Sequence, residues 1–330
     1  MPREPLRLAV VSCGAIAQAH LRGIAACEDA KLVAVVSRDG GRREKAAAEF
    51  GAQRTYGAFE EVLKDDGVDA VVICSPNFLH FPCAMAALRA GKHVLVEKPI
   101  ADGYEEGVAL VAEAERRGLR LMSSQNSRYL AAMRKAREIL LSGEVGRPLH
   151  MLYTLTGWYE GPSSWWKDCK RFLIANSGSH PLDFFPWMTG AKPVRVYATA
   201  NANKPGFPGE DDFCVHLTLD NEAQAITYTT INSRFSRRDL IVVCERGTLF
   251  LDGLRKLSRD GGEALVEGGP DPFADQMREF VSAVLEGRAP GNSGREALVS
   301  LAIIDAAYRS VEEARAVGLS QDGSGRWHFQ

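Results

Sequence analysis

The chain has 330 residues, a formal charge of −2 at pH 7, and 45% hydrophobic and 25% charged side chains, which are ordinary values for a globular protein. This length suggests two domains, each with enough chain to bury a core. The near-neutral charge excludes a protein that neutralises a nucleic-acid backbone, and the apolar content excludes a disordered chain. No apolar run approaches the roughly 18 residues of a membrane span, and the N-terminus does not resemble a secretory signal, so we expect a cytoplasmic protein.

Seven cysteines, an odd number, are spread along the chain without a C-x-x-C pair. This spacing is untypical of a disulfide framework or a zinc site, and we predict no metal. Most of these cysteines are expected to be small buried side chains in a reducing compartment.

The first third of the chain alternates apolar strands with helical patterns. Residues 70–74 (AVVIC) show no polar alternation, which is typical of a strand covered on both faces. Repeated strand–helix alternation predicts right-handed crossovers and a doubly wound parallel sheet, which makes this an α/β domain. The expected strands are 6–12, 31–37, 54–56, 70–74, 93–96 and 119–123, and the expected helices are 15–27, 41–50, 58–64, 80–90 and 103–118.

The pattern changes near residue 125, where we place the boundary between a first domain, residues 1–125, and a second, residues 126–330. Consecutive strand patterns with short turns predict an α+β domain with a large, mostly antiparallel and open sheet. Residues 220–222 suit a hairpin tip, and residues 201–212, rich in Pro and Gly, suit a loop. The expected helices are 130–142, 272–287 and 294–317, and the expected strands are 149–157, 194–200, 213–219, 225–231, 239–245 and 248–251.

The first strand runs into a turn that resembles the G-x-G-x-x-G/A fingerprint of dinucleotide-binding domains, with Ser12, Gly14 and Ala17 at its three positions. Gly14 lets a pyrophosphate approach the backbone, and Ala17 permits close packing of the helix on the sheet. Ser12, however, stands where the tight turn favours glycine. The alternative is an ordinary strand-to-helix turn of a doubly wound fold. The candidate cofactor contacts in this turn are Ser12, Gly14, Ala15 and Ile16.

The end of the second strand bears on which dinucleotide would bind. An acidic residue about 20 residues after the glycine turn usually binds the ribose 2′-hydroxyl of NAD. Here Ser37 stands 23 residues after Gly14 and is followed by Arg38. A hydroxyl with a guanidinium suits the 2′-phosphate of NADP, so NADP is favoured over NAD. Asp39 as a ribose ligand would instead favour NAD, and Arg38 as a solvated surface charge would favour neither.

Two further segments follow predicted parallel strands, at the edge where open α/β sheets bind ligands. The first contains the candidate residues Ser75, Asn77 and His80. The second is E-K-P at residues 97–99, where Lys98 is suited to present an ammonium group to a cleft in which burial can tune its pKa. A surface turn is the alternative for either segment taken alone.

Together these segments resemble the glucose–fructose oxidoreductase / inositol dehydrogenase (Gfo/Idh/MocA) family over nearly the whole chain. The shared motifs, in the family's order, are C-S-P-N-x-x-H at residues 74–80, E-K-P at 97–99, a W-K-D stretch at 166–168 and G-x-H-x-x-D at 178–183. The resemblance implies an N-terminal Rossmann domain and a C-terminal domain with a large, mostly antiparallel sheet. It also implies reversible NAD(P)-linked oxidation of a sugar, polyol or related alcohol, and it points to a cis Lys98–Pro99 bond.

The resemblance assigns roles residue by residue. Lys98 matches the family lysine that contacts the reacting oxygen and often the nicotinamide ribose. His180 matches the family histidine used in proton transfer or substrate binding. Asn77 and His80 lie where the family lines the nicotinamide end of the cleft, and Glu97 fits a ribose or nicotinamide position.

One departure from the family concerns the residue four positions before His180. The family often has Asp there, on the same helix face as the histidine, whereas this chain has Asn176. An amide orients a hydroxyl or binds Lys98 but cannot take a proton, so Lys98 or His180 must act as the base. Losing a carboxylate also makes Lys98 easier to deprotonate. Asp183, three residues after His180, is expected to be structural.

Several aromatic residues precede this motif, and aromatic faces stack well on sugar rings. Packing in the sheet core or between subunits is the alternative for most of them. The preferred candidates for substrate contact are Trp166 and Lys167. Tyr159 and Arg128 are further candidates, although Arg128 can instead form an interdomain ion pair. The aromatic residues are Tyr153, Trp158, Tyr159, Trp165 and Trp166, and a cluster of Arg234, Arg237 and Arg238 suits a solvated turn or an oligomer contact.

We therefore predict an NAD(P)-dependent oxidoreductase that acts on a CH–OH group of a sugar or polyol, with Lys98 and His180 at the reacting centre. One open alternative is a family member that retains NAD and cleaves glycosidic bonds through transient oxidation, with Tyr159 or His180 in the elimination. Another is a non-catalytic NAD(P)-binding protein. The open sheet face predicts a homodimer or homotetramer, and no nucleic-acid or membrane partner is expected.

Overall fold

The computed structural model describes residues 4–161, 165–169 and 171–330, which form two compact units. The first unit contains the chain up to Asn126 together with Asp271–Leu298, and the second contains Ser127–Pro270 and Val299–Gln330. The first unit thus includes a segment from late in the chain, which a single division near residue 125 does not anticipate. Among the described helices, none is long and apolar enough to cross a membrane.

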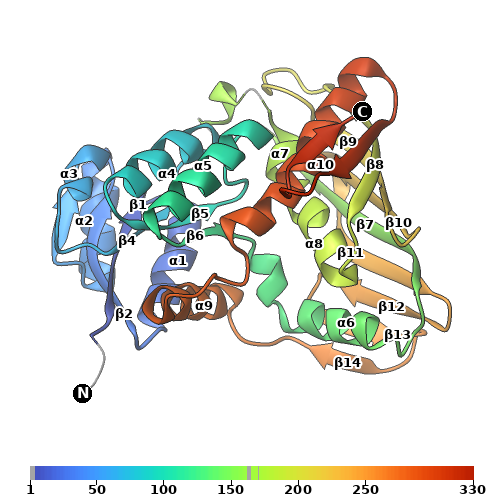
Figure 1. Ribbon diagram of the computed structural model, residues 1–330, viewed down its shortest axis with the longest axis horizontal. Coiled ribbons are helices and arrows are strands. Elements are labelled where there is room, and N and C mark those ends of the chain that lie inside the picture. The colour runs from blue at the N-terminus through green and yellow to red at the C-terminus, as the bar shows by residue number, and fades with distance from the viewer. Residues whose placement is uncertain (1–3, 162–164, 170) are drawn as a thin grey trace. The chain divides into compact units, whose positions relative to one another are not determined.

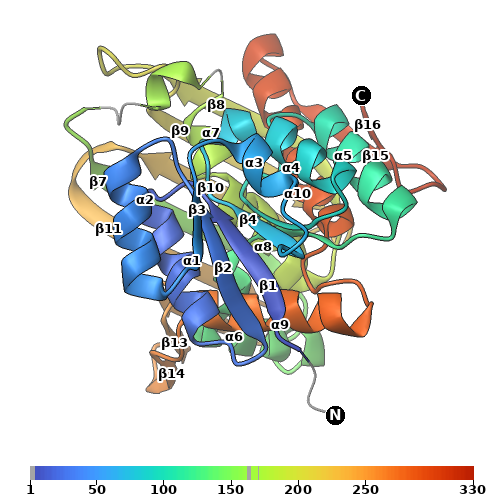
Figure 2. The same ribbon diagram turned by 90° about the vertical axis from the view of Figure 1, so that its left-hand side faces the viewer.

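A six-stranded parallel sheet in the order β3-β2-β1-β4-β5-β6 forms the centre of the first unit. The strand order reverses beside β1, so the sheet is doubly wound and the predicted α/β class is confirmed. Every residue of β4 is buried because helices lie on both faces of the sheet (Figures 1 and 2). The strands are β1 (Leu6–Val11), β2 (Ala30–Val36), β3 (Arg54–Tyr56), β4 (Ala70–Ile73), β5 (His93–Glu97) and β6 (Leu121–Ser124). The helices are α1 (Ala15–Ala25), α2 (Gly40–Phe50), α3 (Phe59–Leu63), η1 (Asn77–Leu79), α4 (His80–Arg89) and α5 (Tyr104–Arg117).

The segment that returns to the first unit packs against a helix and against the edge of the sheet. α9 (Pro272–Glu286) approaches α1 so closely that a Cβ on Gly23 would lie 2.8 Å from the Phe273 carbonyl oxygen, which requires glycine there. Beyond α9, the carbonyl of Asn292 accepts from Ser123 N at 3.0 Å, and its Nδ2 donates to the Ser123 carbonyl at 2.7 Å. These bonds cover the edge of β6 that faces away from β5, where the backbone groups of Ser123 would otherwise lack these partners.

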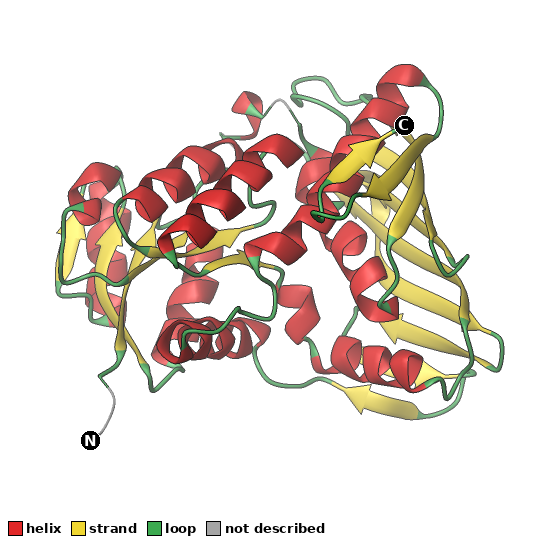
Figure 3. Cartoon of the chain, viewed as in Figure 1, coloured by secondary structure: helices red, strands yellow, loops and turns green. Residues whose placement is uncertain are grey.

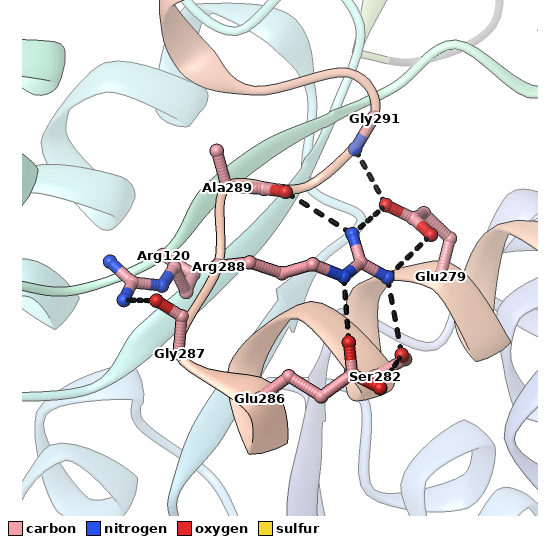
Figure 4. Close-up of polar contacts among 8 residues, drawn as sticks. All are labelled: Arg120, Glu279, Ser282, Glu286, Gly287, Arg288, Ala289 and Gly291. Carbon is pink, nitrogen blue, oxygen red and sulfur yellow. Dashed lines mark hydrogen bonds and ion pairs between the residues drawn. The ribbon is translucent and has the colours of Figure 1, made fainter.

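Arg288 holds the connection between α9 and α10 (Gly294–Glu313). Figure 4 shows its guanidinium between Glu279 and Glu286, with Nη1 and Nη2 donating to the two Glu279 oxygens at 2.6 and 2.9 Å. These hydrogen bonds lower the pKa of Glu279 below its usual value. Glu279 also accepts from Gly291 N at 2.7 Å. Side chains of α9 therefore fix the turn that brings Asn292 to β6.

The second unit contains a ten-stranded sheet in the order β14-β13-β12-β11-β7-β10-β9-β8-β15-β16. All its neighbouring pairs are antiparallel except β7 and β10, so the mostly antiparallel prediction is confirmed. Figure 3 shows the strands of this sheet in yellow and the helices in red. The strands are β7 (Pro148–Trp158), β8 (Pro193–Asn201), β9 (Asp212–Leu219), β10 (Gln224–Thr230), β11 (Asn232–Cys244), β12 (Gly247–Asp252), β13 (Lys256–Arg259), β14 (Ala264–Glu267), β15 (Val317–Gln321) and β16 (Trp327–Phe329). The helices are η2 (Asn126–Tyr129), α6 (Ala131–Ser142), η3 (Trp166–Asp168), α7 (Leu173–Asn176) and α8 (Ser179–Thr189), with the C-terminal part of α10.

Some elements of this unit differ from the expectation. α8 was not expected, because Pro181 and Pro186 disguise its helical pattern, although Pro181 lies in the first turn, where proline is tolerated. The last helix ends at Glu313 rather than near residue 317, because Ala314 adopts φ +51° and the chain then enters β15. The hairpin tip at residues 220–222 and the loop between β8 and β9 lie where they were predicted.

The two faces of the ten-stranded sheet differ in burial. One face lies against helices: Tyr153 of β7 is buried with its ring 5.4 Å from Phe184 of α8, and α6 packs beside it (Figure 1). On the other face, Tyr197 and Leu152 are 44% and 41% exposed. The strand register places one row across this face, made of Tyr197, His216, Ile226, Leu152, Ile241 and Phe250.

Candidate active site

The glycine turn between β1 and α1 has the form of an anion-binding loop. Gly14 is the N-cap of α1 and has no side chain, so the cap residue offers no side-chain acceptor to the first N–H groups of α1. A Cβ on Gly14 would meet only Ser12 Oγ, at 3.8 Å, which leaves space for a ligand beside the backbone. Ser12 adopts φ +77°, the left-handed conformation that favours glycine. Ala15 opens the helix, and Ile16 is 38% exposed on its first turn.

A cavity of about 520 Å³ adjoins this turn, and all of its lining belongs to the first unit. Two basic residues of α2, Arg42 and Lys45, contribute positive charge to it. Glu49 contributes one carboxylate. The lining residues are Cys13, Gly14, Ala15, Gln18, Arg42, Lys45 and Glu49.

The end of β2 presents Ser37 half-buried and Arg38 exposed. Asp39 is already engaged: it caps α2 by accepting from Arg42 N at 3.0 Å, and its second oxygen lies 3.2 Å from Arg42 Nε. The Ser37 carbonyl accepts from Arg43 Nη1 at 2.7 Å, which fixes the backbone at this strand end. The Ser37 hydroxyl oxygen also accepts from Asp39 N at 3.2 Å, but its O–H group can still donate to a ligand, and the Arg38 side chain is exposed.

Three candidate residues lie beyond the end of β4. The buried hydroxyl oxygen of Ser75 lies beside the Cys83 thiol and has no nitrogen or oxygen partner among the described residues, so it can still bond to a polar ligand. Asn77 is 6% exposed, and its Nδ2 donates to Asp102 at 3.3 Å. His80 is 1% exposed, with Nδ1 2.6 Å from the Pro99 carbonyl and Nε2 2.8 Å from the Ser75 carbonyl. In this structure His80 therefore joins the loops after β4 and β5, and burial lowers its pKa.

Glu97, the last residue of β5, is 7% exposed and belongs to a buried network. Its Oε1 lies 2.8 Å from His20 Nε2 and accepts from Ser124 Oγ at 2.8 Å, while Gln276 donates to the same Ser124 oxygen at 2.9 Å. Burial alone would raise the pKa of Glu97, but the His20 hydrogen bond and charge, helped by Lys98 and Ser124, bring it below its usual value. Glu97 therefore remains a carboxylate on the buried side of the turn that follows β5.

Lys98 follows on this turn and is half-buried. Its backbone N donates to Glu97 Oε2 at 3.2 Å, and the Lys98–Pro99 peptide bond is cis. Glu97 thus fixes the turn on one side of Lys98, and the bond from Pro99 to His80 fixes it on the other. Lysine at the carboxyl end of a buried parallel strand occupies the place where open α/β sheets present ligand-binding groups.

The residues of the first unit fit a nicotinamide dinucleotide. The N-terminus of α1 and the open space at Gly14 suit a pyrophosphate, the end of β2 suits the adenosine ribose, and Ser75 offers a hydroxyl without a nitrogen or oxygen partner among the described residues. No group of three or more His, Cys, Asp or Glu side chains with metal-binding geometry occurs in the described part of the chain.

In the second unit, Arg128 lies in η2 and is bound to Asp183 of α8 by two hydrogen bonds, from Nε at 2.8 Å and from Nη2 at 2.7 Å. The side chains are 7% and 2% exposed, and the guanidinium lies 5.6 Å from the centre of the Trp187 ring. This buried pair joins η2 to α8 within the second unit. A contact of Arg128 with substrate stays a prediction.

Asn176 and His180 lie on either side of a short helix junction. Asn176 is the last residue of α7 and His180 is the second residue of α8, so the two are not on one continuous helix, although Ser177 and Gly178 keep helical dihedral angles. Gly178 is required there, because a Cβ would lie 2.4 Å from the Ile174 carbonyl oxygen. Ser127 Oγ lies 3.4 Å from His180 Nδ1, which restrains the imidazole ring.

The predicted aromatic residues form a cluster that includes two phenylalanines the sequence analysis did not select. Trp166 lies 5.5 Å from Tyr159, 5.0 Å from Phe172 and 5.9 Å from Phe207, measured between ring centres. Lys167 beside it is exposed. Trp166 is thus oriented by packing on the loop between β8 and β9, which carries Phe207.

Trp158 is covered by cations. Lys204 Nζ lies 3.8 Å and the Arg234 guanidinium carbon 4.2 Å from the centre of its ring. Arg237 pairs with Asp239. The arginine cluster therefore includes one residue that stacks on an aromatic ring and one that pairs with a carboxylate.

Family models match both parts of the chain. Residues 6–125 match the NAD-binding Rossmann-fold domain of an oxidoreductase family, and residues 133–250 match the GFO/IDH/MocA C-terminal domain. The chain belongs to the GFO/IDH/MocA family of oxidoreductases. The predicted family is thereby confirmed, and with it the assignment of the chain as an enzyme that binds NAD(P) through a Rossmann domain.

Two curated relatives and one solved structure illustrate this membership. D-apiose dehydrogenase of Paraburkholderia graminis is 27% identical over 94% of this chain and 89% of its own. Inositol 2-dehydrogenase 2 of Saccharopolyspora erythraea is 29% identical over 93% of each chain. The structure of aldose-aldose oxidoreductase from Caulobacter crescentus superposes with a TM-score of 0.88 at 25% identity, covering 96% of this chain and 100% of its own.

Some residues of the site were not predicted from the sequence. His20, Ser124 and Gln276 hold Glu97, yet they come from three distant segments, and no local pattern links them. The nearest signal was His20 on the helix that follows the glycine turn, where a polar residue faces the core. Glu210 and Tyr308, which contact α7, likewise carry no motif.

Proposed function

We propose that this protein transfers a hydride between a nicotinamide cofactor and a sugar, polyol or related secondary alcohol or ketone. The observation that carries the proposal is the buried turn at Lys98, fixed by Glu97 and His80 in the same unit as an uncapped glycine turn. The D-apiose and inositol dehydrogenases among the relatives support the substrate class.

The bound cofactor would accept the hydride, and the chain's own residues would handle the proton and the orientation of the substrate. We assign Lys98 and His180 to the reacting oxygen, where one of them takes the hydroxyl proton. Asn176 has an amide, so its part is to orient a hydroxyl. A lysine on a restrained turn and a histidine restrained by Ser127 are suited to this work, because acid–base catalysis depends on position as well as on pKa.

We further propose that NADP is preferred over NAD, with Ser37 and Arg38 as ligands of the 2′-phosphate. Two features support this preference. Asp39, the candidate ribose ligand for NAD, is engaged as the cap of α2. Arg42 and Lys45 also make the adjoining cavity more favourable to an anion.

The first test is calorimetric binding of NADP and of NAD to protein stripped of nucleotide. We expect tighter binding of NADP, and we expect Arg38→Ala to weaken NADP about tenfold or more while leaving NAD nearly unchanged. Lys31→Ala, at the opposite end of β2, is the matched control. Gly14→Ala should weaken both cofactors with only a small loss of stability, since a Cβ fits in the unliganded turn although alanine is a poorer N-cap than glycine. Equal affinities for NAD and NADP would remove the preference, and binding of neither would remove the proposed function.

The second test is turnover on a panel of sugars and polyols. Lys98→Ala should lower kcat by about 10³-fold, within the range for loss of a general acid–base group, while cofactor affinity changes far less. Lys98→Arg, which keeps the charge but cannot act as a base, should not restore the rate. A Lys98→Ala rate near that of the unmodified protein would refute the site. Cleavage of glycosides without net NAD(P)H would identify the glycoside-cleaving alternative, and cofactor binding with no turnover would identify a non-catalytic protein.

A further inference from the structure

α7 contains only four residues, yet it carries Asn176 and leads directly into α8 and His180. A helix this short is not stable by itself, so its position must come from its neighbours. Its N-cap, Phe172, makes no side-chain capping bond. Instead, Glu210 Oε1 accepts a hydrogen bond from Ile174 N at 2.9 Å, from the loop between β8 and β9.

Tyr308 on α10 completes this contact. Its hydroxyl donates to the same Glu210 oxygen at 2.6 Å and accepts from Ala175 N at 3.4 Å. One carboxylate oxygen and one phenol thus satisfy two consecutive backbone N–H groups of α7. Burial and the neighbouring Glu210 carboxylate raise the pKa of Tyr308 well above its usual value, so the hydroxyl keeps its proton and remains a donor.

Both partners are themselves held in place. The Arg171 guanidinium lies 4.8 Å from the centre of the Tyr308 ring and pairs with Asp305, one turn earlier on α10. Asp211, next to Glu210, is fully buried. It accepts from Asn203 N at 2.7 Å and from Asn232 Nδ2 at 2.8 Å.

The path from this contact to the proposed reacting residues is short. The carbonyl of Leu173, the first residue of α7, accepts from Ser177 N at 2.8 Å and from Gly178 N at 3.1 Å. Gly178 then begins the turn that carries His180, and its carbonyl accepts from Leu182 N at 3.0 Å. A displacement of α7 would therefore move Asn176 directly and His180 through Gly178.

We infer that Glu210 and Tyr308 are positioning residues that hold α7, and through it Asn176 and His180, in the geometry that the reaction requires. This inference rests on the proposed function. It assigns Glu210 the part of a hydrogen-bond acceptor, which needs its oxygen but not its charge. It also gives the loop between β8 and β9 a part in the site, because the loop supplies Glu210 to α7 and Phe207 to the cluster around Trp166.

The test compares Glu210→Ala, Tyr308→Phe and Glu210→Gln with a control on the same helix. Ser310→Ala is that control, since fully buried Ser310 accepts from Ala198 N at 2.9 Å, away from α7. We expect Glu210→Ala and Tyr308→Phe to lower kcat/KM for the alcohol about 10- to 100-fold, as small misplacements of reacting groups do, with cofactor affinity unchanged. Glu210→Gln should retain most of the activity because the amide oxygen still accepts both bonds. Ser310→Ala should lower the melting temperature but not kcat/KM.

A second readout does not depend on turnover. The titration of His180, followed by NMR of labelled histidine, should differ from that of the unmodified protein in Glu210→Ala and Tyr308→Phe, but not in Ser310→Ala. The inference is overturned if the two variants change neither kcat/KM nor this titration more than Ser310→Ala does. Absence of turnover in the unmodified protein would count against the proposed function alone, and the His180 titration would then decide whether the contact positions α7.

Discussion

Ser12 adopts φ +77° in the glycine turn, a conformation that costs an L-residue other than glycine about 1 kcal/mol or more. Ser12→Gly removes this cost, while the greater freedom of glycine in the unfolded chain returns part of it. We expect the free energy of unfolding to rise by about 0.5 kcal/mol, measured by urea denaturation. Ser12→Ala, which keeps the strained backbone, should show no such gain. A Ser12→Gly protein less stable than Ser12→Ala would mean that contacts of the hydroxyl outweigh the backbone strain.

His20 and Glu97 form a buried pair whose two members have 0% and 8% exposed side chains. In the native protein the pKa of Glu97 lies below its usual 4.5, so its contribution to stability is present above that pH and is lost as the pH falls below it. In His20→Leu the carboxylate would lose its partner, and burial would raise its pKa. We expect a loss of about 3–5 kcal/mol at neutral pH.

The sign of the pH dependence provides the sharper measurement. In His20→Leu, stability should fall as the pH rises above about 4.5, because the folded state would then hold its proton more tightly than the unfolded state. Urea unfolding between pH 4.5 and 8 would detect this slope. The double variant His20→Leu/Glu97→Gln should lose the slope, since no buried charge remains. A slope equal to that of the unmodified protein in His20→Leu would contradict the assigned network.

At the scale of elements, the strand–helix alternation predicted the parallel sheet, but it did not predict which late segment completes it. The edge of β6 is covered by Asn292, whose side chain is fully buried and donates to the Ser123 carbonyl at 2.7 Å. Nothing in the local sequence around residue 292 marks it as a partner of residue 123. Such a pairing depends on where two distant segments meet, and hydrophobic periodicity does not encode that.

Asn292→Ala tests the importance of this closure. Removing the amide leaves the Ser123 carbonyl without that partner in a buried place, so we expect a loss of about 1–3 kcal/mol in the free energy of unfolding. Arg295→Ala is a suitable control because its pair with Glu115 is more than half exposed on both sides and should contribute less than about 1 kcal/mol. A loss in Asn292→Ala as small as the one expected for Arg295→Ala, below about 1 kcal/mol, would show that the Asn292 contact is not needed.

For the whole molecule, the feature that bears on association between copies of the chain is the exposed face of the ten-stranded sheet. A row of Tyr197, Ile226, Leu152, Ile241 and Phe250 crosses this face, and the other face is buried beneath helices. Large exposed apolar rows are typical of surfaces that associate. We therefore propose that the protein forms a homodimer or homotetramer through this face.

Light scattering at micromolar concentration would measure this state against the 36.0 kDa mass of one chain. We expect a mass two or four times larger for the unmodified protein. Leu152→Lys should lower it by placing a charge in the middle of the row, because a buried unpaired ammonium group is costly. Leu265→Lys, on the exposed strand β14 and outside the row, should leave the mass unchanged. A monomeric unmodified protein would contradict the proposal.

Sequence patterns alone predicted the fold class, the family and the strand ends that carry the candidate residues. These follow from local information: apolar periodicity, strand-terminating residues and short motifs such as E-K-P at residues 97–99. The sequence also identified Ser12 as a departure from the glycine pattern. The positive φ of Ser12 shows that this serine adopts a backbone conformation that glycine favours.

The three-dimensional fold was needed to show how the candidate side chains are held. It bound Glu97 to His20, Arg128 to Asp183 and α7 to Glu210, through partners that lie 36 to 77 residues away in the chain. It also divided Asn176 and His180 between two helices. These contacts depend on which segments come together in space, and a hydrogen bond to a distant partner leaves no periodic pattern in the sequence on either side of it.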